Sequence, residues 1–368
     1  MKLEHLSIVN YKNVASAELD FSGNVNCLVG KNGMGKTNLL DAIYYLSFCR
    51  SASSLPDRDC ILHGEDFFML KGCYDLNGQA ESVQCGMRRG AKKSFRRDGK
   101  EYRRLSEHIG LLPLVMLTPQ DASLLQGGSE ERRRFMDVII AQFDKPYLTA
   151  LIRYNEALSQ RNTLLKMDPP PADVELYRPW EEQMDYYGRQ VYEARRRFVD
   201  EFLPVFREFY RTISLGREEV SLRYVSHFER GSLLPLLDEV RARDLAVGYT
   251  TRGAHKDELE MRLGDYAMRQ IGSQGQNKTF LVTLKLAQFD FLRRMGHTEP
   301  ILLLDDIFDR LDADRVEQIV RLVASSRFGQ IFITDTNREY LDRIIGALTD
   351  SYKLFAAEDG HYTLLAEQ

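Results

Sequence analysis

The most specific spacing in this sequence belongs to a glycine-rich stretch that ends in lysine and threonine. Gly30-Lys31-Asn32-Gly33-Met34-Gly35-Lys36-Thr37 follows the G-x-x-x-x-G-K-T pattern of a phosphate-binding loop. Its glycines permit positive φ angles and close backbone approach, so successive N–H groups can surround a polyphosphate. Lys36 can then reach the β and γ phosphates of a bound nucleotide, and the Thr37 hydroxyl can bind Mg²⁺. The complete motif disfavours the alternative, a strand-to-helix turn that binds nothing.

Two adjacent acids, Asp305 and Asp306, follow the apolar residues 301–304. Four apolar residues in a row predict a buried strand, and open α/β sheets bind ligands at the carboxyl ends of their strands. Asp305 could hold Mg²⁺ directly or through water, while Asp306 could orient or deprotonate an attacking water. The two acids could instead merely cap the strand, but the phosphate loop upstream favours the functional interpretation.

A third motif is the turn at residues 272–277, which precedes an amphipathic helix expected from Lys278 to Arg294. Backbone N–H groups at a helix N-terminus can bind an anion. Taken alone, such a turn is a weak signal and more often binds nothing.

The sequence on either side of the phosphate loop predicts the secondary structure that such a loop requires. Residues 25–29 predict a buried strand and residues 39–46 a helix, which gives the strand-loop-helix context that the motif requires. Residues 3–10 and 15–21 predict an opening antiparallel hairpin. The loop therefore lies in an α/β head.

The middle of the chain is helical in pattern. Residues 129–167 and 175–211 predict long helices, separated by three prolines at 169–171. We therefore expect an α/β fold whose head has a mixed sheet and an inserted helical arm. The expected domains are an N-terminal head part at 1–124, a mostly helical arm at 125–247 and a C-terminal head part at 248–368.

Two clusters of basic residues could contact a phosphate backbone. The first surrounds an expected hairpin turn at Asp98 and Gly99 and includes the aromatic residues Phe95 and Tyr102. A solvated hairpin edge explains it equally well. The second combines residues 132–134 with residues 195–197, and for the latter a solvated helix face is the favoured alternative. The candidate DNA-binding residues of the first cluster are Arg88, Arg89, Lys92, Lys93, Arg96, Arg97, Arg103 and Arg104.

Composition sets the class of protein. The chain has 368 residues, 43% of them hydrophobic, and a formal net charge of −4, so any nucleic-acid contact must come from local patches. No run of about 18 apolar residues is present and the N-terminus is strand-like, so we expect a cytoplasmic protein without membrane partners. Five scattered cysteines indicate neither a disulfide framework nor a zinc site.

Together, the phosphate loop, the turn Ser273-Gln274-Gly275-Gln276 and the strand end at Asp305 and Asp306 resemble the ATPase heads of the ABC and SMC class. Within that class the sequence is similar to the RecF family over essentially its whole length. Further stretches that carry the resemblance are Leu6-Ser7-Ile8-Val9-Asn10-Tyr11-Lys12-Asn13, Leu117-Thr118-Pro119-Gln120-Asp121, Gly128-Ser129, Arg132-Arg133-Arg134-Phe135, Gly253-Ala254-His255-Lys256-Asp257 and Leu311-Asp312.

The resemblance implies roles for individual residues. Residues 273–276 would be a signature motif that binds the γ phosphate held by a second subunit, so that two heads enclose two ATP molecules. Asp306 would occupy the catalytic acidic position, and Gln120 would sense magnesium and the attacking water. Asp309 to Asp312 would form a loop that contacts the dimer partner.

The sequence departs from the pattern at three places. Ala254 stands where the family usually has proline. Asp306 is a shorter acid than the glutamate of most ABC heads, and Asp335 or Thr336 occupies the region where many ABC proteins have histidine. The last two departures would be consistent with slow hydrolysis.

By resemblance, we expect an ATP-binding repair and recombination mediator. It would form a homodimer on ATP binding, bind DNA at gaps or junctions of single and double strands, and help RecO and RecR load RecA. That activity would support replication restart and the SOS response, and a slow, DNA-stimulated ATPase would time the opening of the dimer.

Two other ATPase classes remain as alternatives. One is an SMC-like ATPase of a defence or partitioning system, which could share both nucleotide motifs and which DNA-junction binding and a RecR partner would distinguish. The other, the nucleotide-binding subunit of a membrane transporter, predicts a histidine after the last core strand, and none is evident.

Overall fold

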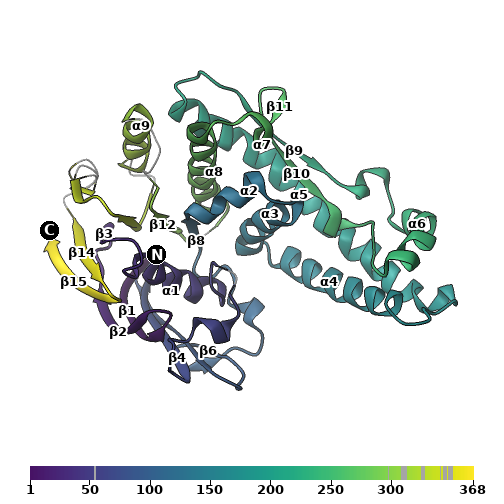
Figure 1. The fold of residues 1–368 in the computed structure, drawn as a ribbon, viewed down its shortest axis with the longest axis horizontal. Helices are drawn as coiled ribbons and strands as arrows, with labels where there is room; N and C mark the ends of the chain where they lie inside the picture. The colour runs from purple at the N-terminus through teal and green to yellow at the C-terminus, as the bar shows by residue number, and fades with distance from the viewer. Residues whose placement is uncertain are drawn as a thin grey trace. The chain divides into compact units, whose positions relative to one another are not determined.

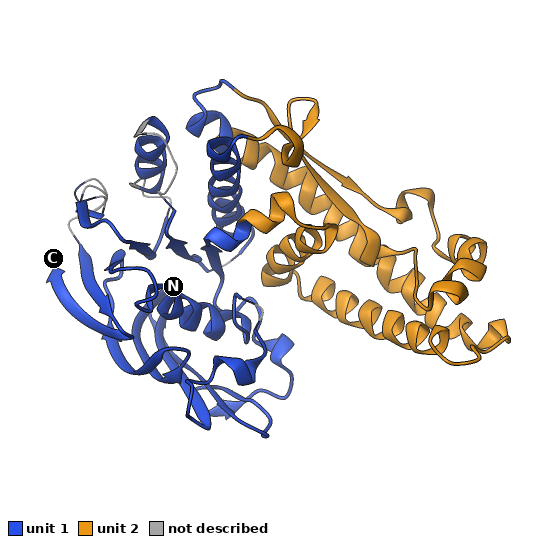
Figure 2. Ribbon diagram, viewed as in Figure 1, with its two compact units in different colours: residues 1–121, 209–217, 273–368 blue, residues 122–208, 218–272 orange. Residues whose placement is uncertain are grey.

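The computed structural model describes residues 1–53, 55–296, 298–307, 313–324, 328–339, 341–342, 346 and 351–368 (Figure 1). The chain divides into two compact units (Figure 2). Unit 1 comprises Met1–Asp121, Phe209–Arg217 and Ser273–Gln368, and unit 2 comprises Ala122–Glu208 and Glu218–Gly272.

The strands of unit 1, as far as it is described, form two sheets. In the first sheet the order is β15-β14-β3-β13-β12-β8; β15 is antiparallel to β14, and the other neighbours are parallel. This mixed sheet confirms the expected α/β class. Its strands are β3 (Val25–Val29), β8 (Leu114–Leu117), β12 (Ile301–Asp305), β13 (Ile331–Asp335), β14 (Tyr352–Glu358) and β15 (His361–Glu367).

The second sheet of unit 1 is antiparallel and contains the expected opening hairpin. Its tight turns use residues with positive φ, such as Asn77 at 55° and Gly78 at 86°, which suit two-residue hairpin turns. In sheet order its strands are β2 (Val14–Asp20), β1 (Lys2–Tyr11), β4 (Phe67–Leu76), β5 (Gln79–Arg88), β6 (Ser94–Arg97) and β7 (Lys100–Glu101).

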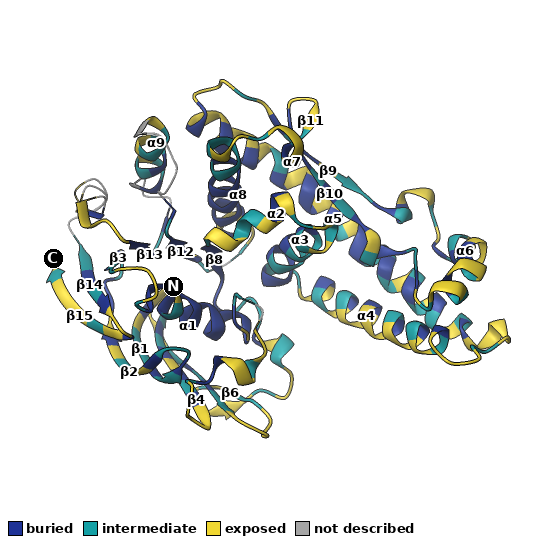
Figure 3. Cartoon of the chain, in the orientation of Figure 1, coloured by how far each residue is buried: buried dark blue, intermediate teal, exposed yellow. Residues whose placement is uncertain are grey.

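Two helices of unit 1 are buried on nearly every side. Helix α1 (Lys36–Phe48) contacts strands of both sheets and is therefore covered from two directions. Helix α8 (Gln274–Met295) packs against β8, and its residues from Thr279 to Leu292 are all buried (Figure 3). Both helices therefore belong to the core of unit 1, where they contact strands of the sheet that carries the phosphate loop. The head also contains α9 (Ala313–Ala324).

Unit 2 is mostly helical. The helical pattern from 129 to 167 forms two helices, because the Asp144 side chain accepts a hydrogen bond from the Tyr147 N–H at 2.8 Å and Pro146 occupies the first turn of the second helix. The helices of unit 2 are α2 (Ser123–Gln126), α3 (Ser129–Phe143), α4 (Lys145–Leu165), most of α5 (Arg178–Ile213), α6 (Leu234–Val247) and α7 (Met268–Ile271).

The compact units differ from the expected domain boundaries. Residues 248–272, expected in the head, lie in unit 2, whereas residues 209–217, expected in the arm, lie in unit 1. The reason is a small sheet in which β10 (Glu258–Leu263) pairs along its length with β9 (Val220–Val225) and with the short β11 (Tyr266–Ala267). Strand patterns alone do not reveal which sheet a strand joins.

His255 lies in unit 2 between two neutral hydrogen-bond partners. Its Nδ1 is 2.7 Å from the Tyr154 hydroxyl and its Nε2 is 3.0 Å from the Thr250 carbonyl oxygen. A carbonyl only accepts, so Nε2 carries the proton and Nδ1 accepts from tyrosine. Burial lowers the pKa of His255 from 6.5 to about 4.

We therefore expect acid to destabilise the folded chain through His255. The folded state keeps this imidazole neutral, so its contribution to stability is complete above pH 6.5 and is lost as pH falls towards 4. Between pH 7.5 and 5 the loss should be about 2 kcal/mol. Urea unfolding at both pH values should show this slope in the wild type and a smaller one in His255→Gln, which keeps a donor but cannot titrate. Equal slopes would contradict the assignment.

Candidate functional site

The residues predicted to do chemistry gather at one edge of the mixed sheet. The carboxyl ends of β3, β13, β12 and β8 are in register, so the segments that follow these strands leave from the same edge. The phosphate loop follows β3, Asp306 follows β12, and Gln120 follows β8 by three residues. The paired residues along this edge are Val29 with Asp335, Thr334 with Asp305, and Leu304 with Leu117.

The phosphate loop has the backbone that its glycines allow. Gly33 and Gly35 have φ angles of 84° and 103°, which residues with a side chain rarely adopt. Lys36 is buried, and its Nζ donates to the carbonyl oxygens of Gly30 at 2.5 Å and Lys31 at 3.0 Å. The ammonium group thus lies against the loop that it is predicted to serve.

Thr37 and Asp305 together make an oxygen-rich site beside this loop. The Thr37 hydroxyl donates to Asp305 Oδ2 at 2.8 Å, and the Thr334 hydroxyl donates to Asp305 Oδ1 at 2.6 Å. Burial raises the pKa of Asp305, and the two hydroxyl hydrogen bonds oppose that rise. A carboxylate and a hydroxyl this close fit Mg²⁺, which takes oxygen ligands and few of them from protein.

Asp306 is held by its backbone. Its φ is 52°, a left-handed conformation that aspartate tolerates better than most residues. Its N–H donates to the carbonyl and hydroxyl oxygens of Thr334, both at 3.2 Å, and its carbonyl accepts from Lys278 Nζ at 3.1 Å. Burial, and to a smaller extent the charge of Asp306, raise the pKa of Asp335 on the next strand.

Gln120 is exposed in a short 3-10 turn, Pro119–Ala122, beyond β8. Its neighbour Asp121 fixes that turn by accepting from the Thr118 N–H at 2.7 Å and by pairing with Lys285 of α8 at 2.7 Å. The turn is therefore anchored while the glutamine side chain faces solvent.

The predicted signature residues begin α8, one turn earlier than the pattern indicates. Ser273 Oγ accepts from the Gln276 N–H at 3.2 Å, and Gln276 Oε1 accepts from the Ser273 N–H at 2.9 Å, a reciprocal capping box. Ser273 and Gln274 are exposed, whereas Gly275 is partly buried. The predicted partner-contacting loop, Asp309 to Asp312, lies outside the described residues.

Some basic side chains of the expected hairpin form ion pairs within unit 1, and others are exposed to solvent. Lys93 Nζ pairs with Asp57 at 2.7 Å and donates to the Cys49 carbonyl at 2.6 Å, while Arg97 forms a bidentate pair with Glu81. Lys93 and Arg97 thus hold their own unit together, and the exposed Arg89 also donates from Nε to the Glu65 carbonyl at 3.1 Å. The exposed candidates are Arg88, Arg89, Lys92, Arg96, Arg103 and Arg104.

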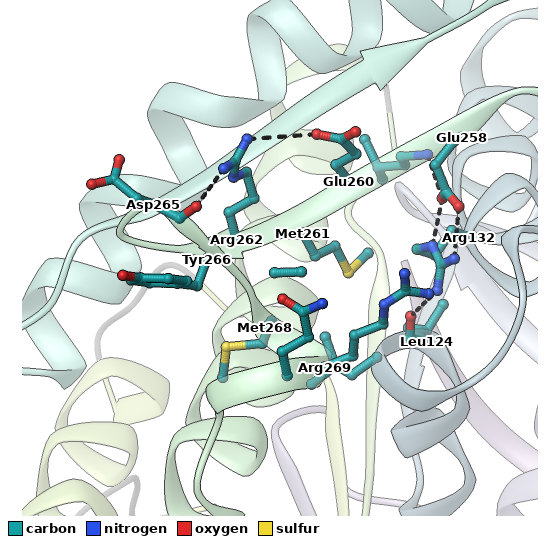
Figure 4. Close-up of a pocket in the computed structure, with 14 residues that line it drawn as sticks. Leu124, Arg132, Glu258, Glu260, Met261, Arg262, Asp265, Tyr266, Met268 and Arg269 are labelled. Atoms are coloured by element: carbon teal, nitrogen blue, oxygen red, sulfur yellow. Dashed lines mark hydrogen bonds and ion pairs between the residues drawn. The ribbon is translucent and has the colours of Figure 1, made fainter.

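The second basic region is only partly a solvated surface, because the first arginine of each triplet is buried whereas Arg196 and Arg197 are exposed. Arg132 lines a hollow of about 330 Å³ within unit 2, where it forms a bidentate pair with Glu258 and donates to the Leu124 carbonyl (Figure 4). Arg195 is only 2% exposed and pairs with Asp137 and Asp257. Both side chains bind unit 2 together.

Sequence reasoning missed three residues at the site: Asn13, Thr334 and Tyr362. Thr334 positions both acids, and Asn13 and Tyr362 hydrogen-bond to the carbonyl oxygens of Gly33 and Gly35. Thr334 had a usable signal, since it precedes Asp335 at the end of a predicted buried strand, and Asn13 ends the first stretch that carries the family resemblance.

The described residues contain neither a cluster of metal ligands nor a membrane-spanning helix. No three or more His, Cys, Asp and Glu side chains gather there to hold a metal. In the same residues no helix has the length and apolar character needed to cross a membrane.

Known proteins with similar sequences and folds support a nucleotide-binding site in this chain. The family model RecF/RecN/SMC N terminal domain matches residues 2–362. The protein named DNA replication and repair protein RecF from Bacteroides fragilis is 57% identical over 369 residues, covering all of both chains. The protein of that name from Porphyromonas gingivalis is 53% identical, covering 98% of this chain and 99% of its own.

Solved structures show the same fold. A structure of the recombination mediator protein RecF with ATP, in the RecFOR pathway, has a TM-score of 0.87 at 26% identity and covers 99% of this chain and 98% of its own. An Smc head bound to the C-terminal winged-helix domain of ScpA has a TM-score of 0.59 at 16% identity, covering 99% and 97%. The second likeness concerns the fold alone and confirms the predicted ABC/SMC-type head.

Proposed function

The chain belongs to the RecF family of DNA replication and repair proteins, and from this premise we propose that it is an ATP-gated DNA clamp. Two copies close on ATP and Mg²⁺ over DNA at a gap or junction, and hydrolysis reopens them. The observation that carries the proposal is the single sheet edge at which the phosphate loop, the Thr37–Asp305 pair and Asp306 meet. Such an edge is where α/β sheets bind nucleotides.

Each residue has a task in this proposal. The loop N–H groups and Lys36 bind the phosphates, and Thr37 and Asp305 hold the magnesium ion, which would neutralise charge that develops on the γ phosphate. Asp306 orients the attacking water, and Gln120 extends from the neighbouring strand to sense it. Aspartate reaches less far than glutamate, so hydrolysis is slow and serves to time opening.

The second subunit completes the site. Ser273 and Gln274 are exposed at the N-terminus of a 22-residue helix, where the helix dipole favours the γ phosphate of a partner's ATP. Because both copies are identical, the contact is made twice and two ATP molecules are enclosed. ATP binding therefore couples to dimer closure.

DNA and protein partners follow from the same proposal. The exposed arginines and lysine of the basic hairpin contact the phosphate backbone, which carries little sequence information. The clamp works with RecO and RecR to load RecA, as the RecFOR pathway of the solved relative suggests. The ATPase head is unit 1, which holds the phosphate loop and both acids, and the helical arm is unit 2.

The test is the mass of the protein in solution with no nucleotide, with ADP and with ATP plus magnesium, each with and without gapped DNA. We expect a dimer only with ATP, strengthened by the DNA. A mixture of Lys36→Met and Ser273→Arg subunits should regain dimers, because a mixed pair keeps one intact site, while either variant alone stays monomeric. A wild type that hydrolyses ATP yet stays monomeric throughout would refute the clamp.

A further inference from the structure

Three consecutive carbonyl groups of the phosphate loop are held from outside the loop. None of the three donors belongs to the loop, and two of them come from the last hairpin of the chain, formed by β14 and β15. The hydrogen bonds are Asn13 Nδ2 to Gly33 O at 3.3 Å, Gly360 N to Met34 O at 3.1 Å, and Tyr362 Oη to Gly35 O at 2.9 Å.

This arrangement fixes the direction of the loop's N–H groups. In a trans peptide the carbonyl of one residue and the N–H of the next point in opposite directions. Holding the carbonyls of Met34 and Gly35 on the outer side therefore turns the N–H groups of Gly35 and Lys36 inward, while the Met34 N–H stays within the loop and donates to the Lys31 carbonyl at 3.4 Å. Inward N–H groups are what a phosphate cradle needs.

The backbone packs closely at two points near these hydrogen bonds. A Cβ on Gly360, whose φ is 79°, would lie 2.3 Å from the Asn13 carbonyl oxygen, and one on Gly30 would lie 2.4 Å from the Ala357 carbonyl oxygen. Asn13 is itself held, because its Oδ1 accepts from Asn38 Nδ2 of α1 at 2.7 Å. Backbone therefore lies close to backbone between the two donor segments, at Gly360 and Asn13, and between the loop and β14, at Gly30 and Ala357.

We propose that Asn13, the turn at Gly360 and Tyr362 form a brace that pre-organises the phosphate loop. Asn13 and Tyr362 are then positioning residues: they act on the phosphates of the nucleotide through the loop and do not touch them. The inference rests on the proposed ATP binding and adds that the C-terminal hairpin is part of the nucleotide site. A loop already in its binding conformation loses less entropy when the ligand arrives.

If the brace orients the phosphate loop, removing one of its hydrogen bonds should weaken the binding of ligands that carry phosphates and leave other ligands unaffected. Tyr362→Phe removes only the hydroxyl, so the Gly35 carbonyl loses its outer donor and keeps the Leu39 N–H of α1 at 3.0 Å, while the ring stays packed. The affinity for ATP and for inorganic tripolyphosphate should fall about fivefold to tenfold, as expected for one lost hydrogen bond. Adenosine binding should stay unchanged, because adenosine has no phosphate for the loop to bind.

Calorimetric titration with ATP, tripolyphosphate and adenosine provides the readout. Tyr352→Phe, at the opposite end of the same hairpin, is the matched control and should bind all three like the wild type. Asn13→Asp, which keeps the oxygen that Asn38 contacts but loses the donor, should also weaken tripolyphosphate binding. Thermal unfolding without ligand separates a weakened loop from a weakened fold, and Tyr362→Phe should unfold within a few degrees of the wild type.

Each result decides something. Unchanged tripolyphosphate affinity in Tyr362→Phe overturns the brace while leaving ATP binding intact. The brace is also overturned if Tyr352→Phe lowers the tripolyphosphate affinity as much as Tyr362→Phe does, or if Tyr362→Phe lowers the affinity for adenosine as well. In either case the effect would belong to the hairpin as a whole and not to the hydrogen bond at Gly35. A wild type that binds neither ATP nor tripolyphosphate overturns the proposed function itself.

Discussion

Lys36→Met is expected to reduce the affinity for ATP by about 100-fold or more. In the structure the Lys36 ammonium group is buried against the carbonyl oxygens of Gly30 and Lys31, so it already lies in the loop where the phosphates would bind. Two charge-assisted hydrogen bonds to the β and γ phosphates contribute about 1.5–3 kcal/mol each, and 1.4 kcal/mol is a factor of ten in affinity. Loss of both bonds therefore gives at least this factor.

The measurement is equilibrium binding of a fluorescent ATP analogue, followed by competition with ATP. Methionine keeps the length and apolar stem of the side chain, so the loop should remain packed. Lys71→Met, on an exposed position of β4, removes the same charge elsewhere and should bind as the wild type does. An affinity for ATP within threefold of the wild type in Lys36→Met would show that this loop is not where the triphosphate binds.

The parts of the site that could be predicted from sequence are those carried by neighbouring residues. The phosphate loop needs glycines and a lysine at fixed spacing within eight residues, and Asp305 and Asp306 follow directly from a buried strand. The order of strands in the sheet then places both at one edge. Local sequence patterns and the parallel order of the strands were therefore sufficient to predict that the phosphate loop and the two acids lie together.

What could not be predicted depends on contacts between distant segments. Tyr362 lies 327 residues along the chain from Gly35, and nothing in its neighbourhood distinguishes it from other tyrosines. Thr334 reaches Asp305 only because β12 and β13 are paired in one particular register. The membership of β10 in unit 2 is likewise decided by its pairing with β9.

Which side chains are buried is the second feature that could not be predicted from the sequence, as the arginines at 195–197 illustrate. Arg195 is buried, whereas Arg196 and Arg197 are exposed, although the three are chemically identical neighbours. On a helix, successive residues point in directions about 100° apart, so one of three adjacent residues can face a core. Only the packing partners show which one it is.

Arg195→Met is the second large effect that we expect, and it concerns stability. Arg195 Nη2 pairs with Asp137 Oδ1 and Nη1 with Asp257 Oδ2, both at 2.8 Å, and Nη1 also donates to the Ala254 carbonyl at 2.9 Å. Removing the cation leaves two carboxylates inside unit 2 without their positive partner, and each keeps only hydrogen bonds such as that from a tyrosine hydroxyl. Breaking a buried pair in this way costs about 3–5 kcal/mol.

Urea unfolding monitored by circular dichroism should show this loss for Arg195→Met, while the exposed Arg197→Met should change the free energy of unfolding by less than about 0.5 kcal/mol. Burial already raises the pKa of Asp257, and Arg195 opposes that rise, so Asp257 should become easier to protonate in the variant. Arg195→Met should therefore recover part of its deficit at acid pH relative to the wild type.

A deficit below 1 kcal/mol would mean that the network contributes little to the fold, and Arg195 would again be a candidate for contacts outside unit 2. If the deficit is as large as expected, any loss of DNA binding in this variant reflects a weakened arm, and only the exposed Arg196 and Arg197 can report on a DNA surface there.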